Sequence, residues 1–400
     1  MAMAENKDKK VLNVPNKQEQ QQIRLSAAEC EEFRPNGNVP NLRFPEFEGE
    51  WEETRLKEIS KFSKERLNSI ELSCSNYVTT ENMLQDYKGI VSATNLPTNT
   101  NVVKFSKGDV LLSNIRPYLK KVWYADKNGG CSADVFVFKA LPICDSNFLH
   151  HVIANDRFIK FVMGGAKGVK MPRGDKEQMI TYKVGLPCIE EQKKIANLLS
   201  LLDERISTQN KIIEKLETLI KGLRVHLTQK TDGYIVYLSE IAKIYQPQTI
   251  SLSEFTEEGY LVYGANGIIG KYREYNHRTE QICITCRGNT CGMVNYTKPK
   301  SWITGNAMIV NTDDYQDKIC KRYLYHYLST YNFNSIISGS GQPQIVRSPL
   351  EKLKVKLPAI LKQKQIATLL DKLQNQIEIN NNILHLYLQQ KQYLFRQMFI

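Results

Sequence analysis

Lysine and arginine side chains crowd two segments in the first half of the chain, where their chemistry is that of anion binding. Segment 104–127 holds six cations against two aspartates, and segment 157–176 holds six against Asp175 alone. The glycine-rich stretch GGAKGVKMPRGD lets the backbone approach a ligand closely. A solvated charged loop is the alternative for any single residue. The candidates for phosphate or base contacts here are Arg116, Lys120, Lys121, Lys167, Lys170 and Arg173, the last three of which we rank highest.

In the second half the candidate residues are mostly amides and arginines in glycine-rich segments. Asparagine and glutamine suit bidentate contacts with adenine, and arginine suits guanine. The segments are GANGIIGKY, CRGNTCG and SGSGQPQI. A loop amide that only caps its own turn is the competing interpretation. The candidates are Asn266, Lys271, Tyr272, Arg287, Asn289, Gln342, Gln344 and Arg347.

Other chemistries find little support in the residue patterns. The Asn/Asp-Pro-Pro-aromatic tetrapeptide of an amino-methyltransferase does not occur, and GANGIIGK has the wrong spacing for a phosphate loop, with Tyr272 in place of its Ser/Thr. Cys283, Cys286 and Cys291 lack a second pair of ligands, with His277 the nearest histidine, so small residues in and beside a buried strand are the better interpretation. We therefore expect no catalytic centre, no metal and no cofactor in this chain.

Composition favours a basic protein with a polyanionic partner. The net charge is +12, with 42% hydrophobic and 24% charged residues, and such a surplus points most simply to nucleic acid. No apolar run approaches the roughly 18–20 residues of a membrane span, and the polar start MAMAENKDKK lacks the apolar stretch of a signal peptide. Nine scattered cysteines suit a reducing cytoplasm.

A direct repeat must position these residues. VGLPCIEEQKKIANLLSLL (184–202) aligns without gaps on VKLPAILKQKQIATLLDKL (355–373), with eleven of nineteen positions identical at an offset of 171. Such density at one offset indicates a duplication. Each copy has a proline that ends a strand-like run (KVGLP, KVKLP) before a proline-free stretch, which predicts a helix start. A helix over 189–230 would be about 63 Å long.

Both predicted helices carry heptad seams in which apolar residues alternate spacings of four and three, the pattern of a coiled coil. Gln209 and Asn380 stand at matching places, where a buried amide can fix register. The alternative is that each helix packs only on its own domain. The core of the two seams is Ile195, Leu199, Leu202, Ile206, Gln209, Ile213 and Leu216, and Ile366, Leu370, Leu373, Ile377, Asn380 and Leu384.

The fold class predicted is α+β, with two mixed α/β domains in tandem, each followed by a long helix, and the helices paired. Short strand-like runs broken by Gly and Asn turns fill both intervening segments. Leu56 and Ile59 parallel Leu238 and Ile241, and the segment 132–134 falls where 304–306 does. The expected boundaries are a flexible extension 1–38, domains 39–188 and 231–359, and helices 189–230 and 360–400.

The LRFPEFEGEW opening, the LPxxxxQxxIAxLL helix start in two copies and the three glycine-rich segments of the second domain resemble those of type I restriction-modification specificity subunits. The resemblance covers about residues 39–400. The duplicated helix start is its most specific part, and the loop motifs are looser.

This resemblance implies a non-catalytic subunit of a methyltransferase and endonuclease complex in the bacterial cytoplasm. Each domain would be a target recognition domain that reads half of a split site in double-stranded DNA. The helices would pair antiparallel, set the spacing and dock two modification subunits. Those use S-adenosylmethionine, and restriction subunits (translocase and endonuclease) use ATP and Mg. The alternatives are a specificity protein for a type II combined endonuclease-methyltransferase, and a coiled-coil scaffold without a DNA role.

Overall fold

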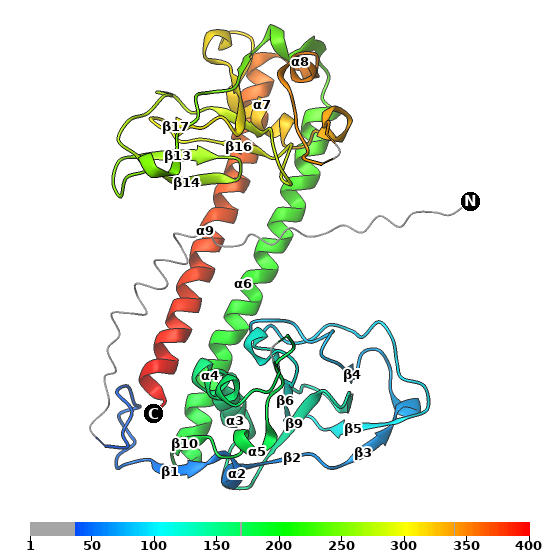
Figure 1. Cartoon of the computed structure of the whole chain (residues 1–400), viewed down its shortest axis with the longest axis vertical. Coiled ribbons are helices and arrows are strands. Elements are labelled where there is room, and N and C mark those ends of the chain that lie inside the picture. Colours follow the sequence, from blue (N-terminus) through cyan, green and yellow to red (C-terminus); the bar gives the residue numbers. More distant parts are fainter. Residues whose placement is uncertain (1–36, 169, 340) are drawn as a thin grey trace. The chain divides into compact units, whose positions relative to one another are not determined.

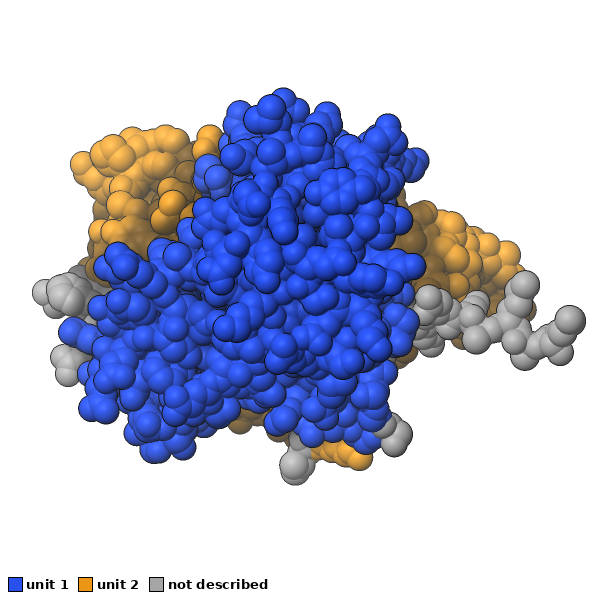
Figure 2. All heavy atoms as spheres, turned by 90° about the horizontal axis from the view of Figure 1, so that it is seen from above, with its two compact units in different colours: residues 1–31, 212–381 blue, residues 32–211, 382–400 orange. Residues whose placement is uncertain are grey.

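The computed structural model describes residues 37–168, 170–339 and 341–400 (Figure 1). All but the last two residues of the predicted extension 1–38 lie outside this range. The chain divides into two compact units: unit 1 contains residues 212–381, and unit 2 contains residues 32–211 and 382–400 (Figure 2). Both unit boundaries fall inside the long helices, so each unit includes part of each helix.

Unit 2 contains two four-stranded sheets and a separate pair of strands. The sheet orders are β2-β9-β6-β7 and β3-β5-β8-β4, and β1 pairs antiparallel with β10. Both central strands of the first sheet are buried almost throughout, which explains their apolar sequences VLLS and VFVF. The bounds are β1 Glu52–Arg55, β2 Ser60–Phe62, β3 Arg66–Asn68, β4 Tyr77–Val78, β5 Asn101–Phe105, β6 Val110–Ser113, β7 Val122–Tyr124, β8 Gly129–Cys131, β9 Val135–Ala140 and β10 Lys183–Leu186.

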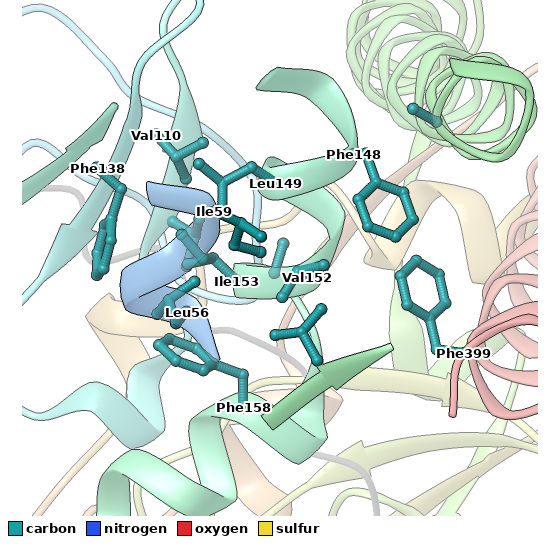
Figure 3. Close-up of a cluster of buried hydrophobic side chains, with 14 of the residues drawn as sticks. Leu56, Ile59, Val110, Phe138, Phe148, Leu149, Val152, Ile153, Phe158 and Phe399 are labelled. Atoms are coloured by element: carbon teal, nitrogen blue, oxygen red, sulfur yellow. The ribbon is translucent and has the colours of Figure 1, made fainter. Parts of the chain in front are cut away.

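Short helices cover the first of these sheets and form the main core of unit 2 (Figure 3). Asp145 and Asn155 cap two of them by accepting hydrogen bonds from backbone N–H groups of the first turn. The ring of Phe148 stacks on that of Phe399 at a centroid distance of 5.5 Å, so residues near the end of the last helix complete this core. The bounds are α2 Leu56–Ile59, α3 Ser146–Ile153, α4 Asp156–Gly164 and α5 Lys176–Met179.

Unit 1 repeats this plan with a four-stranded sheet, β12-β18-β15-β16, a three-stranded sheet, β14-β13-β17, and the antiparallel pair β11-β19. Its core centres on Tyr323, whose side chain is fully buried while its hydroxyl donates to the carbonyl of Lys356 at 2.9 Å. The bounds are β11 Tyr234–Tyr237, β12 Lys243–Tyr245, β13 Tyr260–Gly264, β14 Gly267–Tyr272, β15 Ile282–Thr285, β16 Val294–Tyr296, β17 Trp302–Ile303, β18 Ala307–Asn311, β19 Lys354–Leu357, α7 Lys321–Leu328 and α8 Arg347–Glu351.

The predicted long helices are α6, Ile189–Gln229, and α9, Ile360–Met398. Within unit 2 the Lys391 ammonium donates to the Asp203 carboxylate at 2.5 Å. Within unit 1 the Arg224 guanidinium donates to the Gln374 side chain at 2.9 Å. Because the earlier part of α6 meets the later part of α9, and the reverse holds in unit 1, the helices pair antiparallel. All thirteen predicted seam residues are buried or half-buried, so the view that each helix packs only on its own domain is wrong.

The glutamine of each LPxxxxQ motif has a structural role that both repeats share. Gln192 accepts a hydrogen bond from the backbone N–H of Asp145 at 2.8 Å and donates to the carbonyls of Ile143 and Pro187. Gln363, the residue 171 positions later, makes the same three bonds. It accepts from Cys320 N–H at 2.8 Å and donates to the carbonyls of Lys318 and Pro358. Each amide therefore ties the start of a long helix to the residue that precedes α3 or α7.

Replacing Gln363 with leucine should lower the free energy of unfolding by about 2 kcal/mol. The side chain is 1% exposed, and its loss leaves one backbone donor and two acceptors without their partner. Urea unfolding followed by circular dichroism measures the change. Gln365→Leu, at an exposed position on the same helix, is the matched control. An equal effect of the two substitutions would contradict the role given to Gln363.

Candidate nucleic-acid interface

In unit 2, three loops are joined by backbone hydrogen bonds into one surface, here called the first loop cluster. Its members are residues 114–117 after β6, residues 132–135 at the start of β9, and residues 165–168 and 170–175 between α4 and α5. The third loop is a tight hairpin. The bonds run from N–H to carbonyl as follows: Asn114 to Asp134 at 2.8 Å, Arg116 to Pro172 at 2.8 Å, Gly174 to Asn114 at 3.3 Å, and Lys167 to Arg173 and back at 2.9 Å each.

Unit 1 contains a second loop cluster with the same bonds. It consists of residues 286–289 after β15, residues 304–307 at the start of β18, and residues 337–339 and 341–345 before α8. The matching bonds are Cys286 to Asn306 at 3.1 Å, Gly288 to Pro343 at 3.0 Å, Ile345 to Cys286 at 3.0 Å, and Ser338 to Gln344 and back at 2.9 and 2.8 Å. The two domains therefore present one backbone frame with different side chains.

The hairpins match at the offset of 171 that relates the long helices. Gly168 and Gly339 both have φ of +94°, a conformation that favours glycine. A Cβ on Gly339 would lie 2.5 Å from the carbonyl oxygen of Gln342, so this turn requires glycine. A proline, Pro172 or Pro343, occurs four positions after this glycine in both hairpins. The other two loops of each cluster match at an offset of 172.

The basic residues predicted in the first domain differ in how they are held. Lys167 pairs with Asp175 at 2.6 Å, and Arg173 lies 3.5 Å from Asp134. Arg116 and Lys170 are exposed and form no ion pair with any of the residues described. These four cations, all in the first loop cluster, give it a positive surface with two charges still uncompensated.

Lys120 and Lys121 follow the short turn Pro117–Leu119 and are engaged elsewhere. The Lys120 ammonium donates to the Asp156 carboxylate at 2.9 Å, and that of Lys121 donates to the Thr80 carbonyl at 2.5 Å. Burial lowers the pKa of Lys121. Both side chains are half-buried, which makes them weaker candidates than Arg116.

In the second domain four predicted residues lie in the second loop cluster. Arg287, Asn289 and Gln342 are exposed and Gln344 is half-buried. Their side chains form no hydrogen bond with the described part of the chain, which leaves donors and acceptors free for a ligand. Asn266 lies in the β13–β14 turn beside this cluster, where its side-chain oxygen accepts from the Thr290 hydroxyl.

The remaining three predicted residues of the second domain also lie outside the second loop cluster. Tyr272 is 7% exposed and packs edge-on against Trp302 at 5.0 Å, so this side chain belongs to the core of its sheet, and the expected base contact is corrected. Lys271 is a half-buried strand residue whose backbone pairs with Thr256. Arg347 begins α8 and pairs with Glu351 at 2.7 Å.

Sequence reasoning missed the partners that orient these side chains. The Asp134 carboxylate lies beside Arg173, a contact that the match of segment 132–134 with 304–306 did not indicate. Within the hairpins Met171 matches Gln342, and Lys167 matches Ser338. Extending the repeat backward from the helices identifies the hairpins, because Gly168 and Pro172 recur 171 residues later.

The cysteines of the segment 283–291 lie in and beside the buried strand β15. Cys283 and Cys286 are buried, and burial raises the pKa of the Cys283 thiol to about 12 and raises that of Cys286. Within residues 37–168, 170–339 and 341–400, no group of three His, Cys, Asp or Glu side chains is placed to hold a metal ion. No helix in the same ranges is long and apolar enough to cross a membrane.

In a comparison with known proteins, the same family model matches both halves of the chain. The model of the type I restriction modification DNA specificity domain matches residues 48–218 and 234–386. The specificity subunit of the type I restriction enzyme MjaVIII of Methanocaldococcus jannaschii is 26% identical over 390 residues, 84% of this chain and 88% of the relative. The specificity subunit of EcoprrI of Escherichia coli is 34% identical over 148 residues, 36% of each chain.

The solved structures agree on the fold. The S subunit of a type I restriction-modification system from M. genitalium superposes with a TM-score of 0.69 at 17% identity, covering 90% of this chain and 99% of that one. At this identity the likeness concerns the fold alone, and it confirms the predicted class of two mixed domains in tandem, each followed by a long helix.

Proposed function

Because this chain belongs to the family of type I restriction-modification DNA specificity subunits, we propose that each of its two domains reads one half of a bipartite site in double-stranded DNA through its loop cluster. The observation that carries the proposal is the repeated backbone frame. Five matched hydrogen bonds hold equivalent loops in both domains, whereas the side chains that the loops present differ. A shared backbone frame with different side chains suits two domains that bind the same kind of ligand, duplex DNA, but recognise different base sequences.

Charge and exposure support nucleic acid as the ligand. The first loop cluster carries Arg116, Lys167, Lys170 and Arg173, and the second carries Arg287 with four amide side chains. Cations that neutralise phosphates supply affinity, and amides and arginines supply contacts to base edges. We propose that the chain itself contributes no catalytic group and no cofactor.

The long helices are proposed to set the half-site spacing and to bind the modification subunits. Their outer faces expose large apolar side chains, among them Leu201, Leu386 and Tyr393 in unit 2, at 51%, 61% and 57% exposure, and Ile379 in unit 1, at 49%. Such residues are typical of protein interaction surfaces. S-adenosylmethionine, ATP and Mg would be used by the modification and restriction subunits, in a bacterial cytoplasm.

Exchanging residues 231–359 for the second domain of another specificity subunit should change one half of the recognised sequence and leave the other half unchanged. The complex assembled with modification subunits would be tested by mapping methylated sites on a genome. The reciprocal exchange of residues 39–188 is the matched control and should change the other half. A change in both halves, or in neither, would contradict the modular reading. Failure of the wild-type complex to bind any duplex would instead favour a scaffold without a DNA role.

A further inference from the structure

We propose that Arg173 and Gln344 are equivalent specificity-determining residues, and that Arg173 reads guanine in the first half-site where Gln344 reads adenine in the second. The inference rests on the proposed function, because it assigns a base to one position within each loop cluster. The observation that carries it is the contact between the Arg173 and Asp134 side chains, at two positions whose equivalents in the backbone frame are Gln344 and Asn306.

The backbone fixes the equivalence of the two positions. Arg173 closes its hairpin through two hydrogen bonds with Lys167, and Gln344 closes its own through two with Ser338. The carbonyl of the preceding proline, Pro172 or Pro343, accepts a hydrogen bond from the first loop of its cluster in both domains. The backbones of Arg173 and Gln344 are therefore held in equivalent positions.

The facing residue is also equivalent. Asp134 accepts a backbone hydrogen bond from Asn114, and Asn306 accepts the matching bond from Cys286. The first domain therefore has a carboxylate beside its arginine. The second domain has a neutral amide, Asn306, at the backbone position equivalent to Asp134.

Arg173 has the geometry of a residue that reads a base. Its side chain is 57% exposed, and one terminal nitrogen lies 3.5 Å from an Asp134 carboxylate oxygen. This contact restrains the guanidinium, and its other N–H donors have no hydrogen-bond partner among the described residues. Two parallel donors match the N7 and O6 acceptors of guanine. The carboxylate also disfavours close approach of a phosphate, since the two anions repel.

Gln344 offers the other pattern. A side-chain amide carries one donor and one acceptor side by side, which matches N7 and the N6 amino group of adenine. Neither Gln344 nor Asn306 forms a side-chain hydrogen bond within the described ranges, so the amide is available. The exchange of both members removes one positive and one negative charge together, so no unpaired ion remains.

The neighbouring lysines do not fit this role. Lys167 is 81% exposed and pairs with Asp175 at 2.6 Å, and its match in the second cluster is Ser338. A lysine ammonium is a point charge on a flexible stem, without the planar fork of arginine. Lys170 is exposed without an ion pair to a described residue, which suits a phosphate contact.

The test is the double substitution Arg173→Gln with Asp134→Asn, assembled with modification subunits and selected against randomised duplexes. One position of the first half-site should change from guanine to adenine, with roughly a 10- to 100-fold reversal of preference. The second half-site should not change. The reciprocal variant, Gln344→Arg with Asn306→Asp, should change adenine to guanine in the second half-site only, and it gives an independent result if the first variant folds poorly.

Lys170→Ala is the matched control in the same hairpin. It should weaken binding to all sequences alike and reduce the salt dependence by about one phosphate contact. If the Arg173 variant behaves like this control, or if both variants keep the wild-type sequence, the inference is overturned while the proposed function stands. If the wild-type complex selects no bipartite sequence, the proposed function itself fails.

Discussion

At pH 5.5 the chain should be less stable to unfolding than at pH 7.5 by about 3 kcal/mol, because several buried or half-buried histidines remain neutral in the folded state. Burial lowers the pKa of His150 to about 3 and that of His277 to about 4, and it lowers the pKa of His151 well below the usual value. His150 and His277 each contribute about 1.4 kcal/mol across this interval, and His151 acts in the same direction. Urea unfolding at the two pH values measures the sum.

The sign follows from where the proton binds. The unfolded chain takes up a proton on each of these imidazoles near pH 6.5, whereas the folded chain does so only at much lower pH. Stability is therefore complete above about pH 6.5 and is lost as the pH falls toward 4 and 3. His326 adds to the effect, since burial lowers its pKa although Asp371 opposes the shift.

A single substitution separates this effect from general acid sensitivity. The Nδ1 atom of His150 is buried without a hydrogen-bond partner in the described residues. His150→Leu should therefore reduce the pH difference by about 1.4 kcal/mol. His385→Leu, at an exposed position of α9, serves as the control. A pH difference below about 1 kcal/mol in the wild-type chain would refute the expectation.

Replacing Leu370 with alanine should lower the free energy of unfolding of unit 1 by about 2–5 kcal/mol, from lost burial and from the cavity left behind. Leu370 lies in the seam of α9 and is fully buried, whereas Leu369 beside it is 46% exposed. Leu369→Ala is the matched control, with the same change of chemistry at a site that faces outward, and should cost no more than about 0.5 kcal/mol. Equal costs measured by urea unfolding would show that the seam is not a packed interface.

The helices were predictable because their signal is local and repeated. The heptad spacing of residues such as Ile195 and Leu199 depends only on the period of a helix, and the second copy supports the first. The same repeat identified the glutamines Gln192 and Gln363 as a motif, but not their bonds. Each glutamine bonds to a loop that lies 43–49 residues before it in the sequence, and the spacing of the motif cannot show such a contact.

The loop residues were harder to place because exposure depends on tertiary packing. Tyr272 and Arg287 both lie in glycine-rich segments, yet Tyr272 is covered by Trp302 and Arg287 reaches the surface. The match of segment 132–134 with 304–306 was visible in the sequence, but the hairpins match at an offset of 171 instead of 172, which hid the match of the whole clusters. One extra residue between these segments breaks a gapless alignment while the hydrogen bonds persist.

Each compact unit is assembled from separated stretches of sequence, and this has a consequence for synthesis on the ribosome. Leu394, Met398 and Phe399 belong to the main core of unit 2, although most of that unit lies before residue 212. Unit 1 has all of its residues once position 381 has emerged. Unit 2 must wait for residues 382–400, so the earlier-made domain completes its core later, and the apolar side of α6 that it contains needs protection meanwhile.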